Sequence, residues 1–182
     1  MTGRCVALFR GINVGTAKRI AMADLRALFE RLGYQDVRTL LNSGNVVFTT
    51  TKSPAGAAPR IEKAVAERLG VQSRVTVLTA KRLADVVRGN PLTKTGRNPS
   101  LLLILVPRDA AALSEAGKLA MHEWKPEALA VGKGAAYLWC ANGINKSALW
   151  LEINRVLGDR GTSRNMATMT KLLALCDAAA DA

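Results

Sequence analysis

The chain has 182 residues, and 49% of them are apolar, which is enough to bury the core of one large domain or of two small ones. Its formal net charge of +12 favours polyanionic partners such as nucleotides and nucleic acids. The longest strongly apolar run, residues 101–106, is far too short to cross a bilayer, so we expect no membrane partner.

Few residues of the chain favour metal or redox chemistry. Cys5, Cys140 and Cys176 lie far apart, no CxxC or Cys/His cluster occurs, and His122 is the single histidine. We therefore expect three ordinary thiols, no metal site, no disulfide framework and no cofactor. The first residues lead into a strand-like segment without an apolar signal region, which predicts a cytoplasmic protein.

The first half of the chain alternates strand-like and helix-like patterns. Apolar residues at helical spacing predict helices, and β-rich runs bounded by turn residues predict strands. The expected order is β-α-β-β-α-β, with strands at 5–12, 36–41, 46–50 and 74–78 and helices at 22–32 and 60–69. This order is that of the ferredoxin-like unit, a four-stranded antiparallel sheet with two helices on one face.

The second half partly repeats this pattern. A bridging helix at 81–88, which Thr79 can cap, and a basic loop precede a strand at 101–106. Asp109 can cap the next helix, which runs to about residue 121, and strands follow at 128–131 and 135–140. Helices are expected at 147–157 and 164–175, so the last strand of this unit would be missing or replaced by helix.

The fold class predicted for the whole chain is α+β, with two ferredoxin-like halves of which the second has a helical C-terminus. The expected division is 1–79 for the first half, 80–100 for the bridge, 101–176 for the second half and 177–182 for a tail. The strand at 101–106 does not alternate, so we expect cover on both of its faces. The halves or a homodimer can supply that cover, so the chain is a monomer or a homodimer.

Two polar turns in the first half form the candidate site. The first is Arg10-Gly11-Ile12-Asn13-Val14-Gly15, after the first strand, and the second is Asn42-Ser43-Gly44-Asn45, between the second and third strands. A crossover helix makes the first two strands parallel, and the first strand neighbours the third. Both turns should therefore lie at the same edge of one sheet.

The chemistry of this edge suits an anion. Glycines let backbone amides approach a ligand, a helix begins shortly after the first turn, and Lys18 and Arg19 add positive charge. The predicted ligand-binding residues here are Arg10, Gly11, Asn13, Gly15, Lys18, Ser43, Gly44 and Asn45. The alternative is that Asn and Gly serve only as turn formers, with Asn13 bonded to the backbone of its own loop.

These motifs make the chain resemble a known family. Arg10 to Gly15, Ser43-Gly44-Asn45-Val46-Val47-Phe48, Asn90-Pro91 and Thr162-Ser163-Arg164-Asn165 together resemble the bacterial domain-of-unknown-function 1697 family. The resemblance implies a small cytosolic α/β protein of two ferredoxin-like halves with no established activity. The family's last motif usually continues with Trp and Asn, where this chain has Met166 and Ala167, so a contact made by that Trp would be weakened here.

The last motif adds two candidate ligand-binding residues, Arg164 and Asn165. Thr162 or Ser163 can cap the final helix, which would place Arg164 in its first turn, where a cation is unfavourable unless it meets an anion or an acidic side chain. Asp159 and Glu152 are the acidic alternatives in the sequence.

Three functions remain open from the sequence. The first is binding of an anionic, phosphate-bearing ligand, a nucleotide or nucleic acid, at the edge formed by the two turns. The second is an enzyme acting on a small polar substrate there, although no catalytic triad or carboxylate pair is evident. The third is an interaction or oligomerisation module anchored by Trp124, Tyr137, Trp139 and Trp150, which can equally form the core of the second half.

Overall fold

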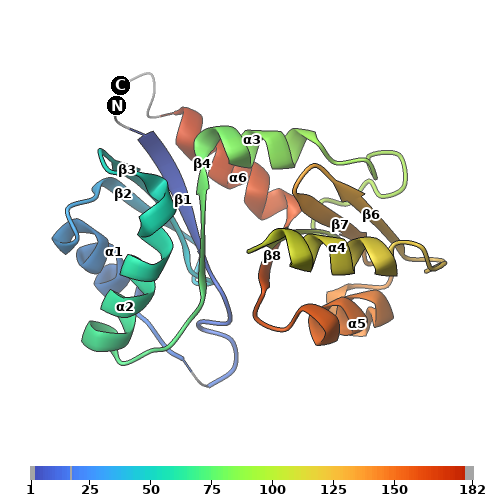
Figure 1. Ribbon diagram of the computed structural model, residues 1–182, viewed down its shortest axis with the longest axis horizontal. Helices are drawn as coiled ribbons and strands as arrows, with labels where there is room; N and C mark the ends of the chain where they lie inside the picture. The colour runs from blue at the N-terminus through green and yellow to red at the C-terminus, as the bar shows by residue number, and fades with distance from the viewer. Residues whose placement is uncertain (1–2, 17, 179–182) are drawn as a thin grey trace. The chain divides into compact units, whose positions relative to one another are not determined.

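The computed structural model describes residues 3–16 and 18–178. These residues form two four-stranded antiparallel sheets and six α-helices, shown in chain order in Figure 1. The chain divides into two compact units, Met1–Leu83 with Leu172–Ala182, and Ala84–Lys171.

The first unit has the ferredoxin-like topology expected from the sequence. Its sheet has the strand order β2-β3-β1-β4, in which the central strand β1 pairs antiparallel with both β3 and β4. Helix α1 connects β1 to β2, and α2 connects β3 to β4. The elements are β1 (Gly3–Phe9), α1 (Met22–Arg31), β2 (Gln35–Leu40), β3 (Asn45–Thr50), α2 (Ala57–Leu69) and β4 (Val75–Thr79).

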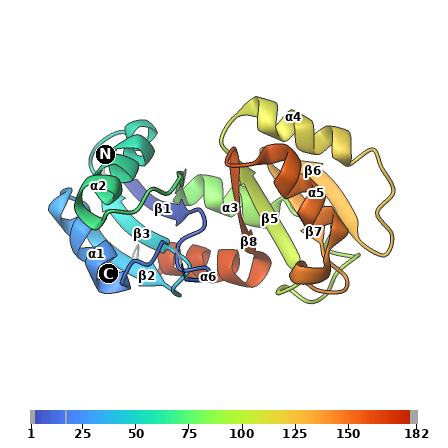
Figure 2. The ribbon, with the colours of Figure 1, turned by 90° about the horizontal axis from the view of Figure 1, so that it is seen from below.

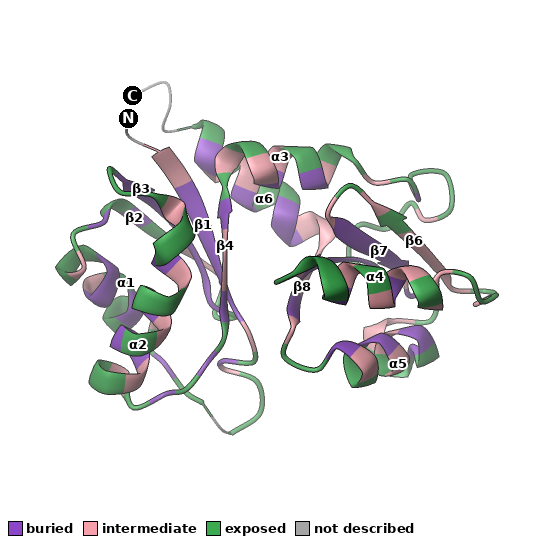
Figure 3. Cartoon of the chain, viewed as in Figure 1, coloured by how far each residue is buried: buried purple, intermediate pink, exposed green. Residues whose placement is uncertain are grey.

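One face of this sheet is covered by α1 and α2. Each helix buries one stripe at helical spacing, with Leu25, Leu28 and Phe29 on α1 and Ile61 and Val65 on α2. Phe29 lies at the centre, and its ring makes an edge contact with Phe48 of β3 at 5.3 Å between centroids. Figure 3 shows β1 buried along most of its length, as the middle strand of such a layer must be.

The second unit repeats the topology. Its sheet has the order β6-β7-β5-β8, again with the first strand of the unit in the middle. Its strands are β5 (Leu102–Pro107), β6 (Ala128–Gly132), β7 (Ala135–Trp139) and β8 (Gly161–Asn165). Its crossover helices are α4 (Ala110–Leu119) and α5 (Ala148–Leu157), seen from a second side in Figure 2. Each repeat is followed by one further helix, α3 (Ala80–Arg88) or α6 (Met166–Asp177).

The presence of β8 corrects one expectation. The sequence pattern predicted helix from residue 164, with the last strand of the repeat missing. Instead, residues 161–165 pair antiparallel with β5, where Ile104 faces Arg164 and Leu105 faces Ser163. The second repeat is therefore a complete β-α-β-β-α-β unit, and the C-terminal helix follows it.

Strand β5 is buried on both faces, as its continuous apolar run predicted. Leu103 and Leu105 belong to the core formed with α4 and α5. Ile104 is fully buried on the opposite face. On the neighbouring strand β7, Tyr137 Oη donates a 2.7 Å hydrogen bond to the carbonyl oxygen of Val86 in α3. Helix α3 thus contacts the sheet that contains β5 and β7 and helps to cover it.

Two predicted helix caps are present. Thr79 Oγ1 accepts from the backbone N–H of Arg82, and Asp109 Oδ1 accepts from that of Ala112. The predicted tail begins with Asp177, which is the last residue of α6. Residues 179–182 of that tail lie outside the described residues.

Candidate functional site

The two polar turns of the first unit meet at one edge of its sheet, as the topology predicted. Strand β1 ends at Phe9, earlier than the expected residue 12, and the backbone N–H of Phe9 donates to Gly44 O at 2.9 Å. The side chain of Asn13 reaches the same hairpin and donates to Asn42 O at 2.8 Å. The β2–β3 hairpin is therefore bonded both to the end of β1 and to the loop at residues 10–21.

Asn13 organises the loop. Its Nδ2 also donates to Ile20 O at 2.9 Å, and its Oδ1 accepts from the N–H of Ile20 at 2.9 Å. Its backbone is left-handed, with φ of 55°, a conformation that Asn tolerates better than most residues. Both ends of the Asn13 amide are thus engaged in holding the loop closed, so its role is to shape the site.

The hairpin residues are also structural. Asn45 is fully buried, and its Nδ2 donates to Leu40 O and to Ser43 Oγ. Gly44 has φ of 75°, and a Cβ there would lie 2.7 Å from Phe9 Cβ and 2.5 Å from Ile12 Cδ1. Only glycine fits this close approach between hairpin and loop. The Ser43 side chain remains at the surface.

The loop presents cations and exposed backbone. Lys18 is exposed and, like Gly11 and Gly15, has a left-handed backbone. Arg10 is half-buried, with its backbone fixed by Arg74 O, which accepts from the Arg10 N–H at 2.9 Å. The predicted residues of the first turn are therefore close to those of the hairpin, and Lys18 is the cation most open to solvent among them.

A hollow of about 370 Å³ lies at the start of α1, lined by Asn13, Arg19, Ile20, Ala21, Met22 and Asn42. Helix α1 begins after Ala21, which supplies no side-chain cap, and Asp24 is the acidic residue of its first turn. Arg19 is exposed. Ala21 and Met22 were missed as site residues, and the sequence signal for them was only their position at the start of a helix. Arg19 was noted for its charge but was not among the predicted ligand-binding residues.

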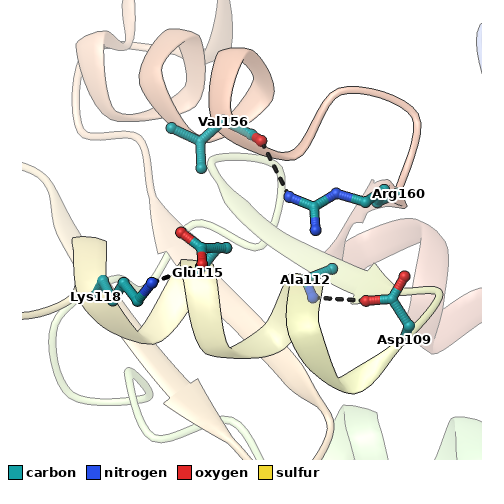
Figure 4. A network of polar contacts seen from close by, with 6 residues as sticks. All are labelled: Asp109, Ala112, Glu115, Lys118, Val156 and Arg160. Atoms are coloured by element: carbon teal, nitrogen blue, oxygen red, sulfur yellow. Dashed lines mark hydrogen bonds and ion pairs between the residues drawn. The ribbon is translucent and has the colours of Figure 1, made fainter.

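The second repeat offers an internal comparison. There the connection from strand to helix is only residues 108–109, and Asp109 caps α4 directly, with 2.7 Å between its Oδ1 and the Ala112 nitrogen (Figure 4). In the same view Lys118 donates to Glu115, which lowers the pKa of that carboxyl group. The first repeat has a long loop and no cap at the equivalent place, and long loops in compact domains are often functional.

Arg164 and Asn165 belong to the second unit and lie on β8, not in a helical turn. Neither Thr162 nor Ser163 caps α6; Asn165 does, because its Oδ1 accepts from the Thr168 N–H at 2.9 Å. Arg164 Nη1 donates to Thr162 Oγ1 and Ser163 O. Glu152, one suggested partner of Arg164, pairs instead with Arg155 at 2.6 Å.

Comparison with known proteins supports the family that the sequence resembles. The family model described as "Protein of unknown function (DUF1697)" matches residues 1–137, which is most of the chain. The chain belongs to the DUF1697 family. The loop at residues 10–21 and the hairpin both lie within the matched part, whereas β8 and the start of α6 lie beyond it.

A solved structure shows the same fold. The chain is similar to the conserved bacterial protein SP0830 from Streptococcus pneumoniae, with a TM-score of 0.79 and 25% sequence identity. The likeness covers 97% of this DUF1697 chain and 99% of that chain. No curated protein matches the sequence.

Other groups of this DUF1697 protein offer little reactive chemistry. Over residues 3–16 and 18–178, no group of three or more His, Cys, Asp or Glu side chains is placed to hold a metal ion. Cys5, Cys140 and Cys176 are free and buried, and burial raises the pKa of each thiol, that of Cys176 to about 11. In the same part of the chain no helix has the length and apolar character needed to cross a bilayer.

The aromatic residues of the second unit serve mainly its core. Tyr137 is 1% exposed, and Trp124 and Trp150 pack against the cluster formed by β5, β7, α4 and α5. Trp124 Nε1 also donates to Leu119 O at 2.9 Å. These rings are therefore engaged within the unit.

Proposed function

We propose that the chain binds a phosphate-bearing ligand, a nucleotide or nucleic acid, at the edge formed by the loop at residues 10–21 and the β2–β3 hairpin. The observation that supports this most is the hollow at the start of α1. There the exposed Arg19 lies beside a helix end that Ala21 leaves without a side-chain cap. A cytoplasmic location accords with such a ligand.

The physical basis is the attraction of an anion to a helix N-terminus. The first amides of a helix have no partner within it, and the aligned peptide dipoles place about half a positive charge there. A guanidinium group beside this end can donate two parallel hydrogen bonds to phosphate oxygens. Arg19 and the start of α1 offer these two elements together, with Lys18 nearby in the sequence.

The loop is also held in shape before a ligand arrives. Two hydrogen bonds of the Asn13 side chain fix Ile20, which directly precedes Ala21, and a third ties the loop to Asn42 O. Less conformational entropy is then lost on binding, which favours affinity. Arg19 and Lys18 are exposed, so salt screens their attraction to a phosphate and binding should weaken as salt concentration rises. Asp24 in the first turn of α1 offsets part of the positive field.

Titration calorimetry with three probes tests this proposal: inorganic phosphate, ATP and a short single-stranded oligonucleotide, each at low and at high salt. We expect binding of ATP or the oligonucleotide at low salt, weakened by salt. A nucleic-acid ligand should show the steeper salt dependence, because more phosphates are neutralised.

Two charge-matched variants locate the site. Arg19→Met should weaken binding about tenfold or more, since a hydrogen bond to a charged group is worth about 1.5–3 kcal/mol. Arg26→Met removes the same charge from α1, where Arg26 pairs with Glu30 at 2.9 Å, and should leave binding unchanged. Equal losses in both variants, or no binding by either nucleotide probe at low salt, would contradict the proposal.

A further inference from the structure

The second unit contains a cavity of about 490 Å³ that shares no residue with the edge described above. Two segments singled out in the sequence contribute to it: Asn90, from the Asn90-Pro91 pair, and Met166, which follows the Thr162–Asn165 motif. They are far apart in the chain and yet line one cavity. Its volume lies within the usual range of small-molecule sites.

The loop that forms one wall of the cavity has a defined conformation. The Asn90 Oδ1 accepts from the Leu92 N–H at 2.9 Å, and Leu92 is 8% exposed. At Gly96 an added Cβ would overlap the indole ring of Trp139, so the loop lies directly against that ring. The Pro99 carbonyl oxygen accepts from the Ala167 N–H at 3.2 Å, which joins the loop to the start of α6.

The wall of the cavity combines an apolar surface with donor groups. Val87, Leu102 and Met166 supply aliphatic and thioether surface. The Oδ1 of Asn90 already accepts a hydrogen bond from the Leu92 N–H, so its Nδ2 is the atom that can donate to a ligand. Arg97 is exposed, and within the described ranges no ion pair involves it. None of the described lining residues is acidic.

Donors beside an apolar surface select an acceptor-rich group on an apolar body. Arg97 and Asn90 can bind both oxygens of a carboxylate, and the Thr93 hydroxyl can add a third donor. The aliphatic part of such a ligand would cover Val87, Leu102 and Met166. Removing this apolar surface from water strengthens binding in proportion to the area covered. A neutral ligand would gain no charge-assisted hydrogen bond from Arg97, and a fully polar one would leave the apolar wall uncovered.

We propose that this cavity, where the loop after α3 meets the start of α6, binds a small carboxylate with an apolar body. The carboxylate pairs with Arg97 and Asn90, and the apolar body rests on Val87, Leu102 and Met166. This site is independent of the phosphate-binding proposal, because the residues of the two sites do not overlap.

Titration calorimetry with octanoate, 1-octanol and acetate tests the proposal. These probes separate the carboxylate from the apolar chain. We expect octanoate to bind about tenfold or more tightly than 1-octanol, because a charge-assisted hydrogen bond is lost in the alcohol, and acetate to bind least. Equal binding of octanoate and 1-octanol would show that the carboxylate is not recognised, which would overturn the proposal.

Three variants place the binding at this cavity. Arg97→Met should reduce the affinity for octanoate to that for 1-octanol. Lys94→Met is the control, because Lys94 lies in the same loop but outside the lining, and it should leave the affinities for both probes unchanged. Met166→Trp should fill the cavity and weaken both probes. Thermal melts confirm that each variant is folded. Octanoate binding that survives in folded Met166→Trp, or that falls equally in Lys94→Met and Arg97→Met, would contradict the assignment.

Discussion

The side-chain amide of Asn13 donates to the carbonyl oxygen of Asn42 across 2.8 Å, and this bond joins the loop after β1 to the β2–β3 hairpin. The same side chain also closes its own loop through Ile20. One residue therefore sets the geometry of the whole edge. Its left-handed backbone is a conformation that Asn adopts more readily than most residues.

Asn13→Ala should destabilise the protein by about 1–3 kcal/mol, because three hydrogen bonds are lost and Ile20 keeps buried polar groups without partners. Urea unfolding measures this loss. Asn42→Ala is the matched control, because Asn42 contributes its backbone carbonyl to this bond and the substitution retains that oxygen. If both variants have the same stability, the Asn13 side chain does not hold the loop.

Gly44→Ala should be among the most damaging substitutions at this edge. It forces alanine into φ of 75° and places a Cβ against Phe9 and Ile12. Strain and overpacking together should cost about 2–4 kcal/mol. Gly11→Ala has the same left-handed strain but open space around the new Cβ, so it should cost only about 1 kcal/mol. Equal losses in the two unfolding curves would argue against the close packing of hairpin and loop.

Asp109→Ala should destabilise the second unit by about 1 kcal/mol, because the Ala112 N–H loses its cap. Asp109→Asn, whose side-chain oxygen can still accept that bond, should restore most of the stability. The comparison of thermal melts separates capping from charge. A loss in Asp109→Asn as large as that in Asp109→Ala would mean that the charge, and not the hydrogen bond, is what matters.

Stability should decline as pH rises from about 9 towards 11. Burial raises the pKa of the Cys176 thiol from 9.0 to about 11, so the unfolded chain releases its proton first and unfolding is favoured over that interval. Below pH 9 both states are protonated and the effect vanishes. Urea unfolding of wild type and Cys176→Ala at about pH 8 and pH 10.5 checks this. The stability of Cys176→Ala should fall less between the two pH values than that of the wild type. If both proteins lose the same stability, the effect does not arise from Cys176.

The fold was largely predictable because both halves carry clear apolar periodicity. The stripe of Leu25, Leu28 and Phe29 and the continuous run in β5 each led to the right element. Strand β8 was not predictable. Its sequence, Gly161-Thr162-Ser163-Arg164-Asn165, is short and polar, and pairing with β5 gives it its structure.

The meeting of loop and hairpin followed from topology, whereas the sequence left two roles open for the residues that form it. Asn13 and Gly44 were predicted either to contact a ligand or to serve as turn formers; Asn13 bonds to the backbone of its own loop, as the second alternative expects, and Gly44 allows hairpin and loop to approach closely. Contact with a ligand stays a prediction. Lys18 and Leu41 have left-handed backbones that no sequence pattern predicted. Arg19 and Ala21 line the hollow together with Asn42 of the hairpin, which is distant in the sequence.

A single substitution at Ala21 tests directly whether phosphate binds at the start of α1. Its extended backbone, with φ of −68° and ψ of 136°, suits a capping residue, so Ala21→Asp should cap α1 and raise stability by about 0.5–2 kcal/mol. The new carboxylate would occupy the place proposed for the phosphate and repel it.

The measurement is ATP and oligonucleotide binding by calorimetry at low salt, beside urea unfolding of the same samples. We expect Ala21→Asp to be more stable and no longer to bind. Ala21→Ser, which supplies a neutral cap, should be equally stabilised but less impaired in binding. An Ala21→Asp protein that is stabilised and binds as tightly as wild type would contradict the proposed site.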